Sequence, residues 1–231
     1  MFLRICGIKM NKICVLIPSY NESKTIGDIV HKVKALGLTA CVIDDGSTDN
    51  TGSIAASEGA VVIANKANMG KGAALRSGFA YILNNDYDAV IIIDGDGQHE
   101  VSSIPDFIKS AEDTKPDIII GNRMSDTRAM PYVRRQTNRF MSWLISRMCG
   151  QKIPDTQCGY RLINRKVLES VALSSSNFEI ESELIIRSSR KGFIIGSVPI
   201  KTVYQNETSR INPIVDTLRF IAFVFKMKKE K

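Results

Sequence analysis

The 231-residue sequence lacks the features of several protein classes. Its five cysteines form no CxxC pair and cannot complete an even disulfide framework, which argues against a zinc site and a disulfide scaffold. No apolar run approaches the roughly 18 residues of a spanning helix, and residues 1–10 hold only a short apolar patch instead of a signal peptide. These absences favour a reduced, cytoplasmic protein that is soluble or peripheral to a membrane.

The overall composition is ordinary for a globular protein, with 44% hydrophobic and 24% charged residues. It is enough to bury the core of one large domain or two small ones, and it argues against a disordered or collagen-like chain. The formal net charge is +7, so the surface attracts anions. Charge alone does not distinguish between phosphates, nucleic acid and a lipid surface.

Short apolar runs alternate with helical patterns in the first half of the chain. Because the runs are continuously apolar, they predict buried strands of a parallel sheet at residues 13–17, 40–43, 61–64, 89–93 and 118–120. Apolar residues recur at helical spacing from Ile26 to Val33, with Asn21 as the expected N-cap, and again over residues 71–84. The alternation predicts a doubly wound, mostly parallel α/β sheet.

A polar segment follows four of these strands. The segments are PSYNE (18–22), DDGSTDNT (44–51), DGDGQH (94–99) and GNR (121–123). Ligands of open α/β sheets bind beyond the carboxyl ends of the strands, where such segments converge. We therefore expect the functional site at this edge of the sheet.

The DGDGQH segment brings Asp94 and Asp96 to the end of an apolar strand. Two like charges at one point cost free energy unless a positive charge lies between them. The glycine after each aspartate lets the backbone turn so that both carboxylates converge, although Asp and Gly are also ordinary residues of a surface turn. The carboxylates suit Mg²⁺ or Mn²⁺, with Gln98 as an additional oxygen ligand. His99 is expected to be a neighbour, because these ions do not prefer imidazole.

The segment NMGKGAALRSG (68–78) resembles two nucleotide-binding patterns and matches neither. Asn65 stands near the place of the first glycine of a Walker A loop, and Leu75 stands where the dinucleotide fingerprint needs its third glycine. What remains is a turn with Lys71 that opens a helix, which suits an anionic ligand or is a loop with a solvated lysine. Asp45 is similarly ambiguous between binding a nucleobase N–H and lying in a helix-capping segment.

Seven segments together resemble glycosyltransferase family 2, in the branch of the dolichyl- and polyprenyl-phosphate mannose and glucose synthases. In chain order they are IPSYNE, VIDDGSTDNT, NMGKGAALRSG, IIIDGDGQH, GNRMS, DTQCGYR and FEIESELI. Each is weak alone, whereas all of them in order are specific, and the resemblance runs from residue 12 to about residue 213. It implies a GT-A fold, a UDP- or GDP-linked hexose as donor, Mg²⁺ or Mn²⁺ as cofactor, and transfer with inversion to a polyprenyl phosphate.

The resemblance also implies roles for individual residues. Asp94 and Asp96 correspond to the DxD element, with Gln98 as an additional metal ligand. The expected donor-binding residues are Pro18, Tyr20, Glu22, Asp45 and Lys71. The expected acceptor-phosphate residues are Arg123, Arg134 and Arg135, from a cluster that also contains Arg139. Asp155 is expected to bond sugar hydroxyls, and it joins Arg123 and the two DxD aspartates in the expected catalytic set.

A phosphate acceptor removes the need for a general base, because its second pKa of about 6 leaves it largely deprotonated at pH 7. Arginines then hold one anion against another. A hydroxyl acceptor on a cell-surface glycan is an alternative that would need a base, with Asp155 or Glu181 as candidates. Glu179, Glu181 and Glu183 could equally be sugar ligands or charges at a helix N-terminus. A nucleic-acid-binding module is disfavoured by the 7% aromatic content and the acidic pairs.

The chain divides into three expected parts: a tail over residues 1–11, a GT-A domain over 12–212 and an amphipathic basic helix over 213–231. In the last part the apolar residues extend beyond one stripe and lysines follow at once, as in helices that lie in an anionic lipid interface. We expect this helix to dock the protein on the cytoplasmic face of the membrane. A core helix with a solvated basic tail is the alternative, and a separate membrane partner protein stays open.

Overall fold

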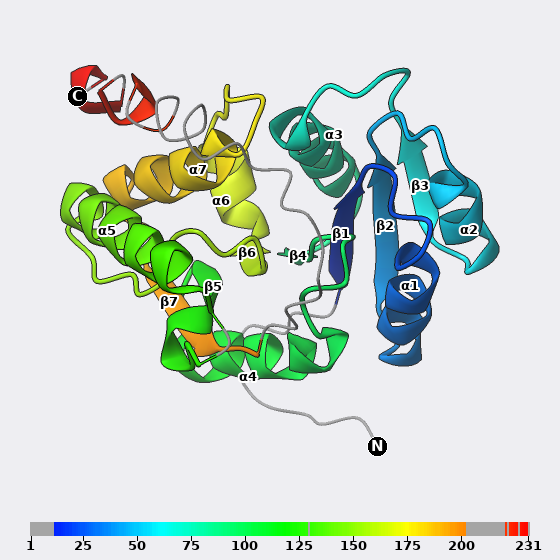
Figure 1. Cartoon of the computed structure of the whole chain (residues 1–231), viewed down its shortest axis with the longest axis horizontal. Helices are drawn as coiled ribbons and strands as arrows, with labels where there is room; N and C mark the ends of the chain where they lie inside the picture. Colours follow the sequence, from blue (N-terminus) through cyan, green and yellow to red (C-terminus); the bar gives the residue numbers. More distant parts are fainter. Residues whose placement is uncertain (1–11, 129, 202–219, 221, 226, 231) are drawn as a thin grey trace.

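A seven-stranded sheet forms the centre of the protein, and helices cover both of its faces (Figure 1). The structure is a computed structural model that describes residues 12–128, 130–201, 220, 222–225 and 227–230. The expected tail over residues 1–11 and the expected start of the C-terminal helix at residue 213 lie outside the described residues.

The strand order is β3-β2-β1-β4-β6-β5-β7. The strands are β1 (Ile13–Ser19), β2 (Thr39–Asp44), β3 (Val61–Ala64), β4 (Ala89–Ile92), β5 (Ile118–Asn122), β6 (Arg161–Asn164) and β7 (Ile195–Pro199). All neighbouring strands pair in parallel except β6, which runs antiparallel to β4 and β5. The mostly parallel α/β sheet is confirmed, and the five predicted strands are β1 to β5; β6 and β7 were not predicted.

Helices fill the two layers beside the sheet. They are α1 (Ile26–Ala35), α2 (Thr51–Ser57), α3 (Lys71–Asn84), α4 (Ile104–Thr114), α5 (Tyr132–Cys149), α6 (Arg165–Ser170) and α7 (Glu179–Arg190), with short 3₁₀ turns η1 (Val101–Ser103) and η2 (Arg123–Ser125). Helix α3 contacts α6 and α7, and α5 contacts α7, whereas α1 and α4 both contact η1 (Figure 1). The predicted helix over residues 71–84 is confirmed as α3.

The core consists mainly of the aliphatic residues of the inner strands, and β1 and β4 are buried along their whole length. The prediction that residues 61–64 form a buried strand is wrong in part. The strand exists as β3, but it lies at the edge of the sheet, and Val61 is 37% exposed. An apolar run alone does not distinguish an edge strand from a central one.

The N-cap predicted at Asn21 is wrong. Helix α1 begins at Ile26 after Thr25, and Asn21 has a left-handed backbone with φ of 55°. Asn is one of the few non-glycine residues that adopt this conformation readily. The Thr25 hydroxyl instead donates to the Gly95 carbonyl at 2.6 Å, so the start of α1 is tied to the turn that follows β4.

The reversed direction of β6 decides which later residues reach the carboxyl edge of the sheet. Arg161, its first residue, pairs with Ile92 of β4 and Ile120 of β5. The segment that precedes β6 therefore lies where β4 and β5 end. This places the DTQCGYR segment beside the DGDGQH and GNR segments.

The described residues near the C-terminus pack against α7 (Figure 1). Residues 220, 222–225 and 227–229 are helical, and the buried ones are Phe220, Phe223, Val224 and Met227. Arg187 pairs with Glu230 at 2.7 Å, and Arg190 donates to the Met227 carbonyl. Phe225 remains 62% exposed. Much of the apolar surface expected to face lipid is thus covered by the domain. Within the described part of the chain, no helix combines the length and apolarity that crossing a membrane requires.

Candidate active site

The first two polar segments are bound to each other at the carboxyl edge of the sheet. Asn21 Oδ1 accepts a hydrogen bond from the Thr48 amide at 2.8 Å, and the Asn21 amide donates to Ser47 Oγ at 3.0 Å. The Glu22 amide donates to Thr51 Oγ1 at 2.8 Å. These bonds fix the backbone next to Tyr20 and Glu22, whose side chains are partly buried. Pro18 is buried within β1.

Asp45 fastens the loop that leads into α3. Its carboxylate is 4% exposed and accepts from Asn65 Nδ2 at 2.7 Å, from the Gly70 amide at 2.8 Å and from the Met69 amide. The carboxylate therefore has a structural task next to the expected donor pocket. Its contact with a nucleobase stays a prediction.

Lys71, the first residue of α3, lies between two carboxylates. Its Nζ is 2.6 Å from Asp94 Oδ1 and 2.7 Å from Glu181 Oε1. Burial opposes the charge of Lys71, but the two carboxylates outweigh burial and raise its pKa above the ordinary value. Burial likewise opposes the charge of Asp94, yet the ammonium of Lys71 lowers the pKa of Asp94. A positive charge thus lies beside Asp94, and it is supplied by the protein.

Three backbone amides around the start of α3 are bonded within the protein. The amides of Gly72 and Ala73 donate to the Ser176 carbonyl at 2.9 and 3.3 Å, and the Gly70 amide is used by Asp45. The loop between α6 and α7 therefore covers this helix end, and a Cβ on Gly72 would lie 2.6 Å from the Ser175 carbonyl oxygen. The sequence predicts that this turn suits an anionic ligand, and the side chain of Lys71 is the part of the turn that contacts Asp94 and Glu181.

The Asp94–Gln98 turn has the donor set of a hard metal ion. The backbone amide of Gln98 donates to Asp96 Oδ1 at 2.9 Å, and the side chains of Gln98 and Asp96 are partly exposed. Gly97 has φ of +74°, and a Cβ on Gly95 would collide with Ser19 Oγ, so the turn requires both glycines. Two carboxylates and an amide oxygen fit Mg²⁺ or Mn²⁺, which commonly take their other ligands from phosphate and water. No group of three or more His, Cys, Asp or Glu that could hold a metal occurs among the described residues.

His99 lies beside this turn and is buried. Its Nδ1 is 3.9 Å from Asp94 Oδ2, and its Nε2 is 3.9 Å from Cys158 Sγ. Burial lowers the pKa of His99 to about 4, with Asp94 opposing the shift and Arg123 and Lys71 adding to it. The lowered pKa favours the neutral imidazole near pH 7, and the place of His99 as a neighbour of the metal ligands stays a prediction.

Arg123 and Asp155 pair with each other. Arg123 Nε donates to Asp155 Oδ2 at 2.8 Å and Nη2 donates to Oδ1 at 2.9 Å, a bidentate pair in which both residues are at least 95% buried. Asp155 also accepts from the amides of Arg123 and Gln157. Sequence reasoning assigned the two side chains separately to acceptor and sugar. The structure joins η2 to the segment before β6 through them, and substrate contact by either stays a prediction.

The predicted basic cluster lies on α5. Arg134 and Arg135 are partly exposed and Arg139 is exposed, and the guanidinium of Arg135 stacks 5.4 Å from the centre of the Tyr132 ring. A pocket of about 450 Å³ is lined by α5, by Met124 and Thr127, and by residues 152–154. Its lining combines cationic with apolar side chains, among them Arg135, Arg139, Lys152, Met124, Trp143 and Ile153.

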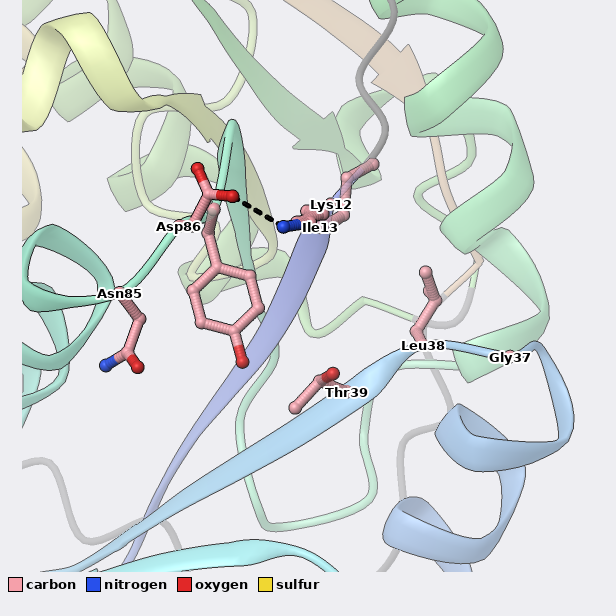
Figure 2. Close-up of a pocket in the computed structure, with 8 residues that line it drawn as sticks. Lys12, Ile13, Gly37, Leu38, Thr39, Asn85 and Asp86 are labelled. Carbon is pink, nitrogen blue, oxygen red and sulfur yellow. Dashed lines mark hydrogen bonds and ion pairs between the residues drawn. The ribbon is translucent and has the colours of Figure 1, made fainter.

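A second hollow lies at the opposite edge of the sheet, where β1, β2 and β4 begin. Figure 2 shows its lining, including Lys12, whose Nζ is 2.5 Å from Asp86 Oδ2. The other lining residues are Ile13, Gly37, Leu38, Thr39, Asn85 and Tyr87. The hollow therefore contains none of the predicted site residues.

Two residues of the site were not assigned from the sequence. Glu181, whose role was left open, is a partner of Lys71, and its Oε2 is 3.6 Å from Arg161 Nη2. Arg161 is fully buried and donates to the carbonyls of Cys158, Thr156 and Glu181. The only signal was its place in DTQCGYR, because an arginine that begins a buried strand needs partners.

Residues 14–172 match the family model for Glycosyl transferase family 2. The uncharacterized protein MJ1222 of Methanocaldococcus jannaschii is 34% identical over 207 residues, which cover 87% of this chain and 85% of that protein. The polyprenol monophosphomannose synthase of Mycolicibacterium smegmatis is 30% identical over 200 residues, which cover 80% of this chain and 75% of that protein.

Similar structures have also been solved. Glucosyl-3-phosphoglycerate synthase from Mycobacterium tuberculosis, in complex with phosphoglyceric acid, matches with a TM-score of 0.75 and 21% identity over 94% of this chain and 79% of that one. A complex of the same enzyme with Mn²⁺, UDP and glucosyl-3-phosphoglycerate has a TM-score of 0.70. The likeness establishes the fold, which is the GT-A fold expected from the sequence.

Proposed function

The chain belongs to glycosyl transferase family 2, and we propose that it transfers a hexose from a UDP- or GDP-sugar to a polyprenyl phosphate, with inversion and with Mg²⁺ or Mn²⁺. The mycobacterial relative is named as a polyprenol monophosphomannose synthase, and the solved transferase binds Mn²⁺ and UDP. The Mn²⁺ of the solved transferase agrees with the donor set of the Asp94–Gln98 turn.

The observation that carries the choice of acceptor is the mixed lining of the cavity beside α5. Arg135, Arg139 and Lys152 offer positive charge, while Met124 and Trp143 offer apolar surface in the same space. A lipid phosphate needs this combination, because its head is an anion and its chain is a hydrocarbon. A free sugar hydroxyl is neutral, so it would gain little from these cations.

We assign the chemistry to two groups of residues. Asp94, Asp96 and Gln98 would hold the divalent ion, which offsets the charge that develops on the departing nucleotide. The arginines of α5 would hold the acceptor phosphate, whose oxygen is already deprotonated near pH 7. Asp155 is committed to Arg123 and buried, which weakens its candidacy as the general base that a hydroxyl acceptor would need.

A donor and acceptor panel tests this function. Purified protein with Mn²⁺ would receive each of several UDP- and GDP-sugars, together with a short polyprenyl phosphate or the matching polyprenol, and products would be identified by mass. We expect a glycosylated product from the phosphate alone and none after EDTA treatment. Product from the polyprenol or from a glycan alone would contradict the proposal.

We also propose that the enzyme works at the cytoplasmic face of a membrane, where its acceptor lies. The described cysteines are free, which suits a reducing compartment. Of the described residues in the expected docking helix, Phe220, Phe223, Val224 and Met227 are buried. Helix α5 by contrast presents Tyr132, Val133, Phe140 and Trp143, each at least 58% exposed, next to its arginines. Aromatic and basic residues on one helix surface suit an anionic lipid interface.

Flotation with anionic vesicles compares these two surfaces. The double variant Val133→Ser, Phe140→Ser removes exposed apolar side chains from α5, and Phe225→Ser removes the exposed ring near the C-terminus. Docking through α5 requires that only the double variant loses vesicle binding. If Phe225→Ser loses binding instead, the C-terminal helix is the docking element, and if neither does, the membrane proposal fails.

A further inference from the structure

The position of Lys71 raises a conflict with metal binding. Its ammonium lies 2.6 Å from Asp94 Oδ1, a carboxylate that the proposed function assigns to a divalent ion. A metal ion that approaches this carboxylate meets a positive charge within a few ångströms, on a side chain that is only 16% exposed. Because like charges repel most strongly where water is excluded, the ammonium and the ion compete for Asp94.

The space around Asp94, Lys71 and Glu181 is narrow. A Cβ on Gly159 would lie 2.7 Å from Asp94 Oδ2, 3.0 Å from Lys71 Nζ and 3.1 Å from Glu181 Oε1. The absence of a side chain at residue 159 therefore makes the space that the three charged groups fill. On its other side, Lys71 lies 5.8 Å from the centre of the Phe178 ring.

The site nevertheless keeps a cation close to Glu181 when Lys71 leaves. Arg161 Nη2 lies 3.6 Å from Glu181 Oε2, and hydrogen bonds to three carbonyl oxygens hold the Arg161 guanidinium in place. Asp94 would exchange the ammonium for a metal ion. Lysine suits such a transfer because its charge is a point on a flexible four-carbon chain, and a donor diphosphate would offer it an anion in place of Asp94.

We propose that Lys71 is an internal cation that occupies Asp94 in the donor-free enzyme and is drawn away by the donor diphosphate, so that metal ion and nucleotide bind together. This inference rests on the proposed function, since it needs a nucleotide-diphosphate donor and a divalent ion. It makes Lys71 a positioning residue that couples the two ligands. Without nucleotide, metal affinity is held low by the protein's own ammonium.

Calorimetric titration with Mn²⁺, in the presence and absence of UDP, tests the coupling directly. Lys71→Met removes the ammonium and keeps the chain length, while Lys66→Met makes the same change of charge at an exposed position of the loop before α3. Without UDP, we expect Lys71→Met to bind Mn²⁺ about tenfold tighter than the wild type, a factor within the usual range of site coupling. Lys66→Met should match the wild type.

Two further measurements separate competition at Asp94 from a general effect of charge. In a protein that carries Asp94→Asn, adding Lys71→Met should give no gain in Mn²⁺ affinity over Asp94→Asn alone. UDP should strengthen Mn²⁺ binding less in Lys71→Met than in the wild type. Lys71→Gln, whose amide can still donate to a carboxylate, repeats the test if the methionine variant does not fold.

Equal Mn²⁺ affinity of the wild type and the Lys71 variants would overturn the inference and leave the proposed function standing. A gain that survives Asp94→Asn would overturn it as well. If the wild type does not bind Mn²⁺ even with UDP, both the inference and the proposed metal dependence fail.

Discussion

Residues 13–99 and residues 100–199 both reach the carboxyl edge of the sheet, but by different routes. In the first region β1, β2 and β4 run toward this edge, so each polar segment that follows a strand arrives there directly. In the second region β6 runs the other way, and it is the segment before the strand that arrives. Helix α7 then adds Glu181 from its first turn.

The two regions also use charge differently. The first region presents Asp94, Asp96 and Gln98 with partly exposed side chains at the end of a strand. The second region holds buried carboxylates in ion pairs, Asp155 with Arg123 and Glu183 with Arg187. Substitutions of the edge residues in the first region should therefore change chemistry, and substitutions of these buried carboxylates in the second should change stability.

The largest effect is expected at Asp96, in the first region. Asp96→Ala removes a proposed metal ligand from a turn and should reduce turnover at least about 10³-fold, or about 4 kcal/mol of transition-state stabilisation. Stability should change by less than about 1 kcal/mol, because no core side chain is lost. Asp113→Ala, at the exposed end of α4, is the control for turnover and for urea unfolding. Activity that persists in the Asp96 variant would break the comparison.

Asp155 provides the opposite case in the second region. Asp155→Asn removes the charge of the carboxylate that pairs with the buried guanidinium of Arg123, which should cost about 3–4 kcal/mol of folding free energy. Glu169→Gln breaks the exposed ion pair with Arg165 and should cost no more than about 0.5 kcal/mol. Urea unfolding of both variants measures the difference. A stable Asp155→Asn enzyme with impaired sugar binding would show that Asp155 acts on substrate after all.

The contrast also explains which elements could be predicted. Strands β1, β2 and β4 are long apolar runs followed by turn residues, so both the strand and its end are visible in the sequence. Strand β6 is only RLIN, with polar residues at both ends, and β7 is IGSVP, which contains Gly and Pro. These segments become strands because neighbouring strands pair with them, which no local pattern reports.

The site was predicted unevenly for the same reason. The Asp94–Gln98 turn could be assigned because its residues are adjacent in the sequence. The contacts of Lys71 with Glu181 and of Arg123 with Asp155 join segments that are far apart in the chain. Residue types suggested a ligand for each of these side chains, but only the fold reveals that they neutralise one another.

Gly159 sharpens the comparison because it lies where the two regions meet. Gly159→Ala would press a Cβ against Asp94 and Lys71, and we expect turnover to fall about tenfold, or about 1.4 kcal/mol. Gly27→Ala, within α1 and with its nearest atom at 3.1 Å, is the matched control. Steady-state kinetics measures both variants. Unchanged turnover in Gly159→Ala would mean that the charged groups relax without consequence.

An effect of similar size, on stability, is expected at Glu183, which organises the loop over α3. Its carboxylate is 1% exposed and accepts from the amides of Ser174 and Ser175, the hydroxyl of Ser174 and Nε of Arg187. Burial opposes the charge of Glu183, but these donors outweigh burial and lower its pKa below the ordinary value of 4.5. Glu183→Gln keeps the shape and loses the charge, so it should cost about 1–2 kcal/mol at neutral pH.

The stability lost in Glu183→Gln should depend on pH. Above the unfolded-state pKa of Glu183 the carboxylate is ionised in both states, and its full contribution to stability is present. As the pH falls, the unfolded chain takes up the proton first, so the contribution decreases until the folded carboxyl is also protonated. The stability gap between the wild type and Glu183→Gln should therefore narrow from pH 6 toward about pH 3, measured by urea unfolding at each pH. A gap that stays constant would mean that Glu183 supports the loop through its shape alone.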